Sequence, residues 1–217
     1  MNIDFFKQTH SYAVDGKFYP SVTEVLSETA LWPQFYEGPK RDYYMARGSA
    51  AHAGIFHLKN LIADCASRQV ARNVTNIVVG GYIEEQDEII RGYLQSWDKL
   101  RRDVTKQFAW TEYEVCVGSH ELEVAGTLDV TGAGRFTGRV MPFLGDYKCG
   151  EAYEEYGYQT AGYHLLKYGE DVSGIIRFGI HLKKDGSMPY IAHHQNKTDF
   201  QIFKEACRIF HQQQKDQ

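Results

Sequence analysis

The sequence predicts a single domain of the α/β class, with α+β character, in which helices cover a central mixed β-sheet. Apolar residues recur at helical spacing through most of the first half of the 217-residue chain, and β-forming residues of alternating polarity follow from Phe108 onward. The hydrophobic content of 43% suffices for one buried core. We therefore expect residues 1–105 to form a mainly helical lobe and residues 106–217 to form the sheet with its flanking helices.

The N-terminal segment predicts a small hairpin followed at once by a short helix. Residues 10–19 alternate in polarity around the Asp15-Gly16 turn. Ser21 and Glu24 then stand at the spacing of a capping box, in which each side chain satisfies an exposed backbone amide of the other residue. We expect this helix to end at Trp32-Pro33, because proline interrupts a helix.

Two longer helices are expected to complete the helical lobe. In residues 41–70 apolar side chains recur at helical spacing, although Gly48 and Gly54 are expected to weaken or bend that helix. A second helix is expected over residues 82–103. Its predicted buried stripe consists of Ile83, Ile90, Tyr93, Leu94, Trp97 and Leu100.

The second half of the chain predicts three strands, a helix, two strands and a closing helix. The Gly-rich stretch 131–134 is interpreted as the turn between the second and third strands, so these two strands are expected to be antiparallel neighbours. The last two strands are expected to form a hairpin across Asp185-Gly186. The expected elements are strands 108–117, 121–130 and 139–148, helix 151–167, strands 174–183 and 188–193, and helix 198–212.

Composition and charge argue against several classes of protein. No apolar run approaches the roughly 18–20 residues of a membrane span, and the N-terminus lacks a signal-peptide pattern, so we expect an intracellular protein without a membrane partner. The formal net charge of −4 argues against a protein that coats nucleic acid through bulk charge. Neither a disulfide framework nor zinc-ligand spacing is formed by the four cysteines, Cys65, Cys116, Cys149 and Cys207.

The first candidate site residues lie at the end of strand 139–148. Asp146 and Lys148 are two residues apart, so both side chains point to one face of the strand, about 6.6 Å apart along the backbone. Burying a carboxylate and an ammonium there is costly unless they pair with each other or bind something else. Taken alone, the motif is far more often a salt-bridged strand end than a functional site.

A second carboxylate favours a cation-binding site over a simple salt bridge. Asp129 lies on the neighbouring strand, and two carboxylates brought together repel each other unless a cation lies between them. Oxygen ligands without nearby cysteine favour Mg²⁺ or Mn²⁺ over Zn²⁺. Glu112 and Glu114 share one face of the preceding strand, and either is able to complete a cup of three carboxylates; we prefer Glu112, although periodicity does not separate the two.

Three further residues are candidates from the helices. Gln159 and Tyr163 are four residues apart on the helix after Lys148, so they share one face and are suited to contact a phosphate or a base. His52 lies on a mostly apolar helix and is a candidate metal ligand or phosphate contact. The alternative for each is ordinary packing or helix surface.

These segments together resemble the PD-(D/E)xK nuclease superfamily, in the branch of RecB-type and phage-type exonucleases. Each motif is weak alone, but five of them in the family's order and spacing rarely coincide by chance. The matching segments are Arg47-Gly48 through His52 for the Arg-Gly-x-x-x-His helix, Glu112 for the upstream acidic residue, Gly126-Thr127-Leu128-Asp129 for the Gly-x-x-Asp strand, Asp146-Tyr147-Lys148-Cys149-Gly150 for the Asp-x-Lys-x-Gly core, and Gln159 with Tyr163 for the Gln-x-x-x-Tyr helix.

The resemblance implies a restriction-endonuclease-like core with a divalent metal site for one or two Mg²⁺ or Mn²⁺ ions. Lys148 would position or help to deprotonate the attacking water, or stabilise the transition state as a fixed cation. The implied metal ligands are Asp129, Asp146, the backbone carbonyl of Tyr147, and Glu112 or His52.

The resemblance also implies DNA contacts outside the metal site. Gln159 and Tyr163 would orient the strand that is cut. In the helical lobe, the candidates for contact with the DNA backbone are Arg41, Arg47, Ser49, Arg68 and Arg72.

The expected function is that of a metal-dependent DNA exonuclease in recombination, repair or phage DNA processing. DNA is the expected partner, a single-strand annealing or recombination protein is a further one, and the oligomeric state stays open. We expect no iron–sulfur cluster, because the chain lacks the cysteine cluster that holds one, and no ATP, because it lacks a phosphate-binding Gly-x-x-x-x-Gly-Lys-Ser/Thr loop. The alternatives are a structure-specific or restriction-like endonuclease and a catalytically inactive DNA-binding module.

Overall fold

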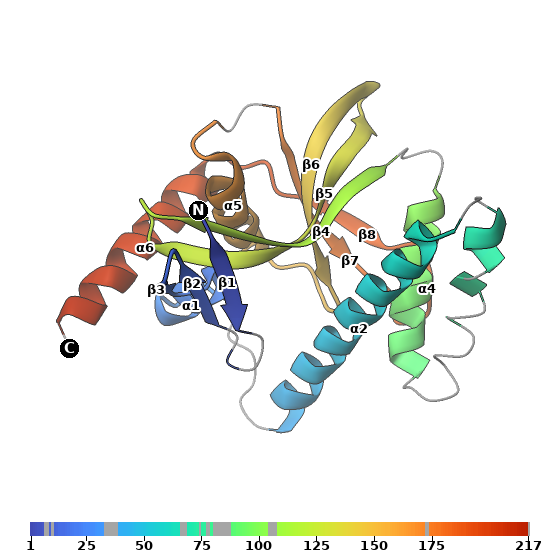
Figure 1. Cartoon of the computed structure of the whole chain (residues 1–217), viewed down its shortest axis with the longest axis horizontal. Helices are drawn as coiled ribbons and strands as arrows, with labels where there is room; N and C mark the ends of the chain where they lie inside the picture. The colour runs from blue at the N-terminus through green and yellow to red at the C-terminus, as the bar shows by residue number, and fades with distance from the viewer. Residues whose placement is uncertain are drawn as a thin grey trace.

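The computed structural model of this chain describes residues 1–6, 9, 11–32, 39–65, 69–73, 75–76, 79, 88–103, 108–171 and 174–216, with the backbone alone for 39–41. A five-stranded sheet from the second half of the chain organises these residues (Figure 1). Its third and fourth strands are parallel and the other neighbours are antiparallel, which confirms the mixed sheet. The strands lie in the order β4 (Ala109–Ser119), β5 (Val124–Phe136), β6 (Arg139–Lys148), β7 (Ile176–His181) and β8 (Tyr190–His193).

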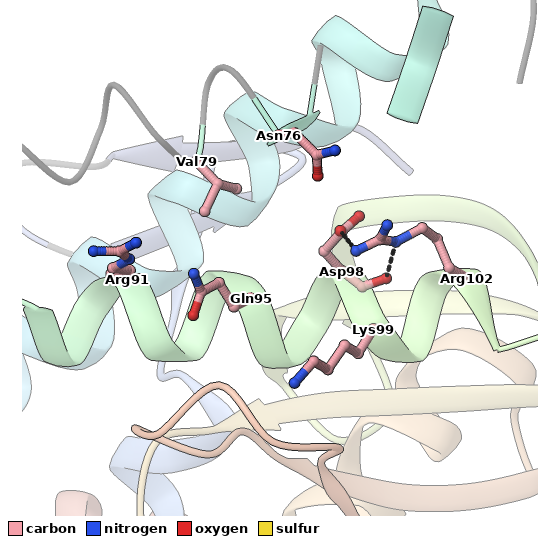
Figure 2. A pocket seen from close by; sticks show the side chains of 7 residues that line it. All are labelled: Asn76, Val79, Arg91, Gln95, Asp98, Lys99 and Arg102. Carbon is pink, nitrogen blue, oxygen red and sulfur yellow. Dashed lines mark hydrogen bonds and ion pairs between the residues drawn. The ribbon is translucent and has the colours of Figure 1, made fainter. Parts of the chain in front are cut away.

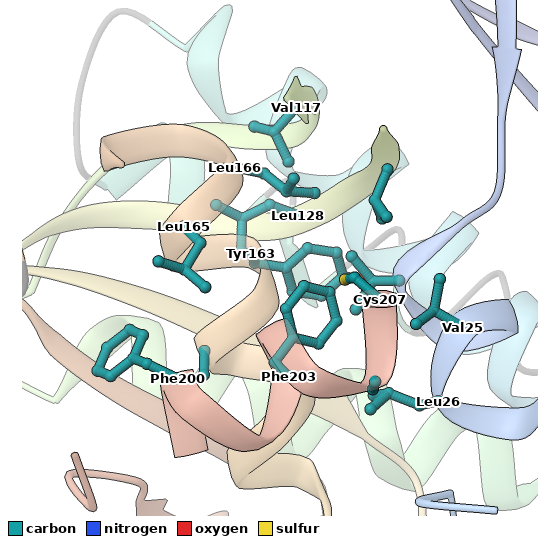
Figure 3. Packing of buried hydrophobic residues seen from close by; sticks show 14 of the residues in the cluster. Val25, Leu26, Val117, Leu128, Tyr163, Leu165, Leu166, Phe200, Phe203 and Cys207 are labelled. Carbon is teal, nitrogen blue, oxygen red and sulfur yellow. The ribbon is translucent and has the colours of Figure 1, made fainter. Parts of the chain in front are cut away.

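One group of helices packs on the N-terminal part of β5 and the end of β6. Helix α5 (Tyr156–Tyr168) connects the parallel strands β6 and β7, and α6 (Thr198–Lys215) and α1 (Val22–Glu28) pack against it. Their apolar faces form a continuous core with the sheet (Figure 3). Its buried side chains include Val25 and Leu26 of α1, Leu128 of β5, Tyr163 and Leu166 of α5, and Phe203 and Cys207 of α6.

The helices α2 (Pro39–Ala63) and α4 (Glu88–Arg102) form a second core with β6 and β7. Figure 1 shows them on the opposite side of the molecule from α5 and α6. The apolar stripes of the two helices pack on a group of aromatic side chains of the sheet, because this contact removes apolar surface from water. None of the helices in the described ranges is both long and apolar enough to cross a membrane.

The N-terminal hairpin belongs to a small separate sheet. Strands β1 (Ile3–Phe6), β2 (Ser11–Val14) and β3 (Lys17–Tyr19) are antiparallel, and β2 and β3 are joined at Asp15-Gly16 as expected. Strand β1 is not among the elements expected from the sequence, and His10, the first residue of the predicted hairpin, lies outside the described residues. Tyr12 of this sheet contacts β5 through a hydrogen bond between its hydroxyl and that of Thr127, at 2.9 Å.

The predicted turn at 131–134 is wrong. These residues are strand, and the chain turns at Thr137-Gly138 instead, where both φ angles are positive. A Cβ atom on Gly132 would lie 2.2 Å from the backbone carbonyl oxygen of Ala109 and 2.9 Å from the ring of Phe143, and one on Gly134 would lie 2.6 Å from the ring of Phe108. The glycines therefore make room for aromatic side chains on a continuous strand, and they do not mark a bend.

Several helix boundaries also differ from the predictions. Helix α1 ends at Glu28, before Trp32-Pro33, and α2 ends at Ala63 but continues through Gly48 and Gly54. Helix α5 begins at Tyr156, five residues later than predicted, and the carbonyl oxygens of Cys149 and Gly150 before it accept hydrogen bonds from side chains of other elements. The beginning of the predicted helix 82–103 lies outside the described residues up to position 87.

The predicted capping box is confirmed and anchors α1. The Ser21 hydroxyl accepts a hydrogen bond from the Glu24 backbone amide at 3.0 Å, and the Glu24 carboxylate accepts one from the Ser21 amide at 3.3 Å. Next to it, the Ala125 amide donates to the Pro20 carbonyl at 3.0 Å. The cap and this hydrogen bond thus hold the N-terminus of α1 beside β5.

We expect Ser21→Ala to lower the free energy of unfolding by about 1 kcal/mol, because it leaves a helix amide without its acceptor. Urea titration followed by circular dichroism measures the change. The matched control is Ser27→Ala, an exposed serine inside the same helix, which we expect to cost nothing. Equal losses in both variants would contradict a role for the cap.

Candidate metal centre

The two predicted aspartates meet where β5 and β6 separate. Val130 pairs with Gly145 at the end of the ladder, and Asp129 and Asp146 are the next residue on each strand. The predicted antiparallel pairing of these strands is therefore confirmed. Both carboxylates are buried, with 6% and 3% of their surface exposed.

His52 of α2 connects the helical lobe to this sheet end. Its Nδ1 lies 3.3 Å from Oδ1 of Asp129, and its Nε2 donates a hydrogen bond to the carbonyl oxygen of Tyr147 at 3.1 Å. The second carboxylate oxygen of Asp129 accepts the Tyr147 backbone amide at 2.6 Å. Both nitrogens of His52 thus face acceptor oxygens, an arrangement that suits the protonated imidazole.

The pKa values of His52 and Asp129 depend on each other's charge. Burial acts to lower the pKa of His52, but the carboxylate of Asp129, with smaller contributions from Asp146 and Glu114, raises it to about 9. Burial also acts to raise the pKa of Asp129, yet His52 and Lys148 hold that pKa below its ordinary value. His52 is therefore positively charged, and Asp129 is ionised, at neutral pH.

The pKa of Asp146 is shifted upward, opposite to that of Asp129. Burial raises its pKa to about 6, and the nearby Asp129 charge adds to the shift against the opposing attraction of Lys148. Its Oδ2 is buried in an ion pair with the Lys148 ammonium and takes part in no hydrogen bond among the described residues. A carboxylate in this position is stabilised by additional positive charge.

The upstream acid in this cluster is Glu114, and Glu112 lies elsewhere. Ligand atoms of His52, Glu114 and Asp129 all lie within 4.8 Å of one another. Glu112 instead accepts hydrogen bonds from Thr131 at 2.8 Å and from Lys167 at 2.6 Å. The preference for Glu112 over Glu114 was made without the strand geometry, which places only the second beside Asp129.

The backbone explains why periodicity did not separate these two acids. The register between β4 and β5 shifts between Trp110 and Glu112, and Glu114 has a φ of 50°, in the left-handed region. Such a conformation is strained for a residue with a Cβ atom and is found at functional sites more often than elsewhere. In the register after the shift, Glu112 pairs with Thr131 and Glu114 lies opposite Asp129, so the pairing with β5 distinguishes the two acids.

Lys148 is held by a chain of polar contacts from α5. Its ammonium pairs with Asp146 and donates to Oε1 of Gln159 at 2.6 Å, and Nε2 of Gln159 donates to the Tyr163 hydroxyl at 3.3 Å. Gln159 and Tyr163 share one helix face, as expected, and both are buried. Gly126 permits this packing, since a Cβ atom there would lie 2.9 Å from the Tyr163 ring.

The candidate DNA contacts of the helical lobe are differently placed. The guanidinium of Arg47 donates to the Cys149 carbonyl at 3.3 Å, so it holds α2 to the residue after Lys148. Ser49 is exposed on α2, and Arg72 is exposed beyond it. The side chain of Arg41 and the whole of Arg68 lie outside the described residues.

Sequence reasoning missed several residues that support the site. The Tyr93 hydroxyl donates to the Cys149 carbonyl at 2.9 Å, and Nδ1 of His181 donates to the Gly150 carbonyl at 3.2 Å. The indole of Trp97 donates to the Tyr147 hydroxyl at 3.2 Å. Tyr93 and Trp97 were predicted only as core residues, because no short-range pattern shows that their polar ends reach β6.

A separate hollow lies against α4 (Figure 2). Within its lining, Asp98 forms an ion pair with Arg102, so one of the three basic groups is already neutralised. The lining contains none of the candidate site residues and consists of Asn76, Val79, Arg91, Gln95, Asp98, Lys99 and Arg102.

Neither the protein-family models nor the curated proteins compared with this chain give a match. The function must therefore be inferred from the site itself. Asp129, Glu114 and the Tyr147 carbonyl offer hard oxygen donors, and His52 lies beside them, while Oδ2 of Asp146 is bound by the Lys148 ammonium. This donor set fits Mg²⁺ or Mn²⁺.

We expect Glu114→Gly to be more stable than Glu114→Ala by about 1 kcal/mol, because only glycine adopts the left-handed conformation without a Cβ clash. Both variants lack the carboxylate, so the comparison isolates the backbone strain. Chemical denaturation of the two purified variants measures the difference. Equal stabilities would show that position 114 is not strained.

Proposed function

We propose that this chain is a metal-dependent deoxyribonuclease with a restriction-endonuclease-like core, acting as an exonuclease in DNA recombination, repair or phage DNA processing. The observation that carries the proposal is the convergence of Asp129, Asp146 and Lys148 at one sheet end, with His52 and Glu114 beside them. The three strands β4, β5 and β6, together with helix α2 from the first half of the chain, supply these groups. The mixed sheet with helices on both sides is compatible with such a core.

In the proposed enzyme, Asp129 and Asp146 would hold the ion, with Glu114 and the Tyr147 carbonyl as further donors, and His52 would become a donor only on losing its proton. A bound Mg²⁺ or Mn²⁺ lowers the pKa of a coordinated water and neutralises charge that develops on the phosphate. Asp129 is suited to this role because it is already ionised, and its position is fixed by the Tyr147 amide. His52 would have to share Asp129 with the ion, since its imidazole occupies the same carboxylate.

Lys148 supplies the fixed positive charge of the proposed site. Asp146 and Gln159 hold its ammonium from two sides, and Tyr163 in turn holds Gln159. A cation preorganised in this way stabilises negative charge developing in a transition state without rearrangement. The buried position of Gln159 and Tyr163 indicates that they position Lys148, in addition to any contact with the strand that is cut.

Two other functions compete with an exonuclease. A structure-specific or restriction-like endonuclease would use the same groups and differs in cutting DNA without an end. An inactive DNA-binding module has no need for a lysine held between a carboxylate and an amide, so the intact arrangement favours an enzyme. A recombination or annealing protein is a further proposed partner.

We expect Asp146→Asn and Lys148→Met each to reduce Mg²⁺-dependent degradation of linear DNA by about 100-fold or more, because each removes a charge that the reaction requires. End-labelled linear DNA and circular DNA, resolved on one gel, report activity, polarity and dependence on an end. The control is Lys204→Met, a partly exposed lysine of α6 that pairs with Glu170.

Full activity in purified Asp146→Asn protein would refute the proposed reaction. Degradation of the circle at the rate of the linear DNA would replace the exonuclease by an endonuclease. Circular dichroism spectra of all variants serve to exclude unfolding as the cause of lost activity.

Metal binding tests which acid belongs to the site. We expect Asp129→Asn and Glu114→Gln to weaken binding of Mn²⁺ about tenfold or more, because each removes a charged oxygen ligand. Glu112→Gln should bind Mn²⁺ like the unmodified chain, since its carboxylate pairs with Lys167. Calorimetric titration measures all three, and a loss confined to Glu112→Gln would restore the original preference for that residue.

A further inference from the structure

Aromatic side chains gather on two sides of Lys148 and Cys149. On the α5 side, the Lys148 ammonium lies 4.4 Å from the ring centre of Tyr156 and 5.5 Å from that of Trp32. Tyr153 continues this group, with its ring centre 5.6 Å from that of Tyr156 and at a nearly perpendicular angle. The rings thus begin at the candidate lysine and lead outward to a half-exposed tyrosine.

A second group lies on α2. The guanidinium of Arg47, which is bound to the Cys149 carbonyl, lies 4.8 Å from the ring centre of Tyr44 and 5.6 Å from that of Tyr43. Tyr44 is 54% exposed and Tyr43 is 48% exposed. Large aromatic side chains are rarely this exposed on adjacent positions of a helix without a partner that uses them.

The charges next to these rings indicate the kind of partner. Arg47 and Lys148 are the cations in contact with the two groups, and each lies over aromatic faces; Lys148 is largely buried against Asp146, so Arg47 is the cation beside the exposed rings. A surface that combines exposed rings with positive charge is typical of binding to single-stranded nucleic acid, because bases stack on the rings while cations attract the backbone. Paired bases are stacked on each other and do not offer their faces in this way.

We propose that Tyr43 and Tyr44 bind unpaired nucleotides of the substrate by stacking, so that the site receives DNA as a single strand. This inference rests on the proposed function and adds the state in which the substrate enters. Tyr44 makes the stacking contact beside Arg47, and the group around Tyr156 receives the strand on the other side of Lys148.

The test is the affinity for fluorescein-labelled dT12 and for a blunt 12-base-pair duplex, measured by fluorescence anisotropy with Ca²⁺ in place of Mg²⁺. Tyr44→Ala should bind dT12 about 5- to 30-fold more weakly, as expected for the loss of one stacked base, and should bind the duplex within about twofold of the unmodified chain. Tyr44→Phe keeps the ring and should retain the affinity for dT12.

The matched control is Phe56→Ala, which removes another exposed aromatic ring of α2, about 18 Å further along the helix. It should leave the affinity for dT12 unchanged. Unchanged affinity of Tyr44→Ala for dT12, or an equal loss for the duplex, would overturn the inference. Neither result depends on cleavage, so failure of the nuclease assay is distinguished from failure of stacking.

Discussion

The contact of His52 with Asp129 and Tyr147 is the interaction on which the rest of the site depends. It joins a helix from the first half of the chain to two strands of the second, within 3.3 Å at both imidazole nitrogens. A buried carboxylate is costly without a compensating partner, and the imidazole supplies one. The position of α2 on the sheet, and with it the positions of Arg47 and Tyr44, follows from this contact.

The opposite side of the site depends on a second buried charge. Arg177 of β7 donates to the carbonyl of Gly157 and to the carboxylate of Asp199, at 2.9 and 3.0 Å. It thereby fixes the start of α5 to the start of α6. Gln159 lies two residues beyond Gly157, so the amide that holds Lys148 is placed by this network. Two buried ionic contacts, one for each group of helices, therefore position the reactive groups between them.

Much of the site follows from short-range patterns. The spacing of Asp146 and Lys148 on one strand is a local property, and the antiparallel pairing that brings Asp129 beside them was predicted, although the turn between the strands lies at Thr137-Gly138 and not at 131–134. The choice between Glu112 and Glu114 was not predicted correctly, because it depends on which residue of β5 lies opposite each acid, Thr131 or Asp129. That register is set by the pairing of the whole of β4 with β5, and a short segment of sequence does not specify it.

The sequence by itself determined most of the elements after β1, their order and the groups of one strand that share a face, since these follow from periodicity and turn chemistry within a few residues. It also determined the capping box that begins α1. Only the tertiary structure decided that Gly132 and Gly134 make room for aromatic rings, and that the carbonyl of Cys149 is bound by α2 and α4. The physical reason is that a buried ring needs space, and a buried polar group needs a partner, on a segment far away in the chain. The local conformational preferences of a residue carry no information about that segment.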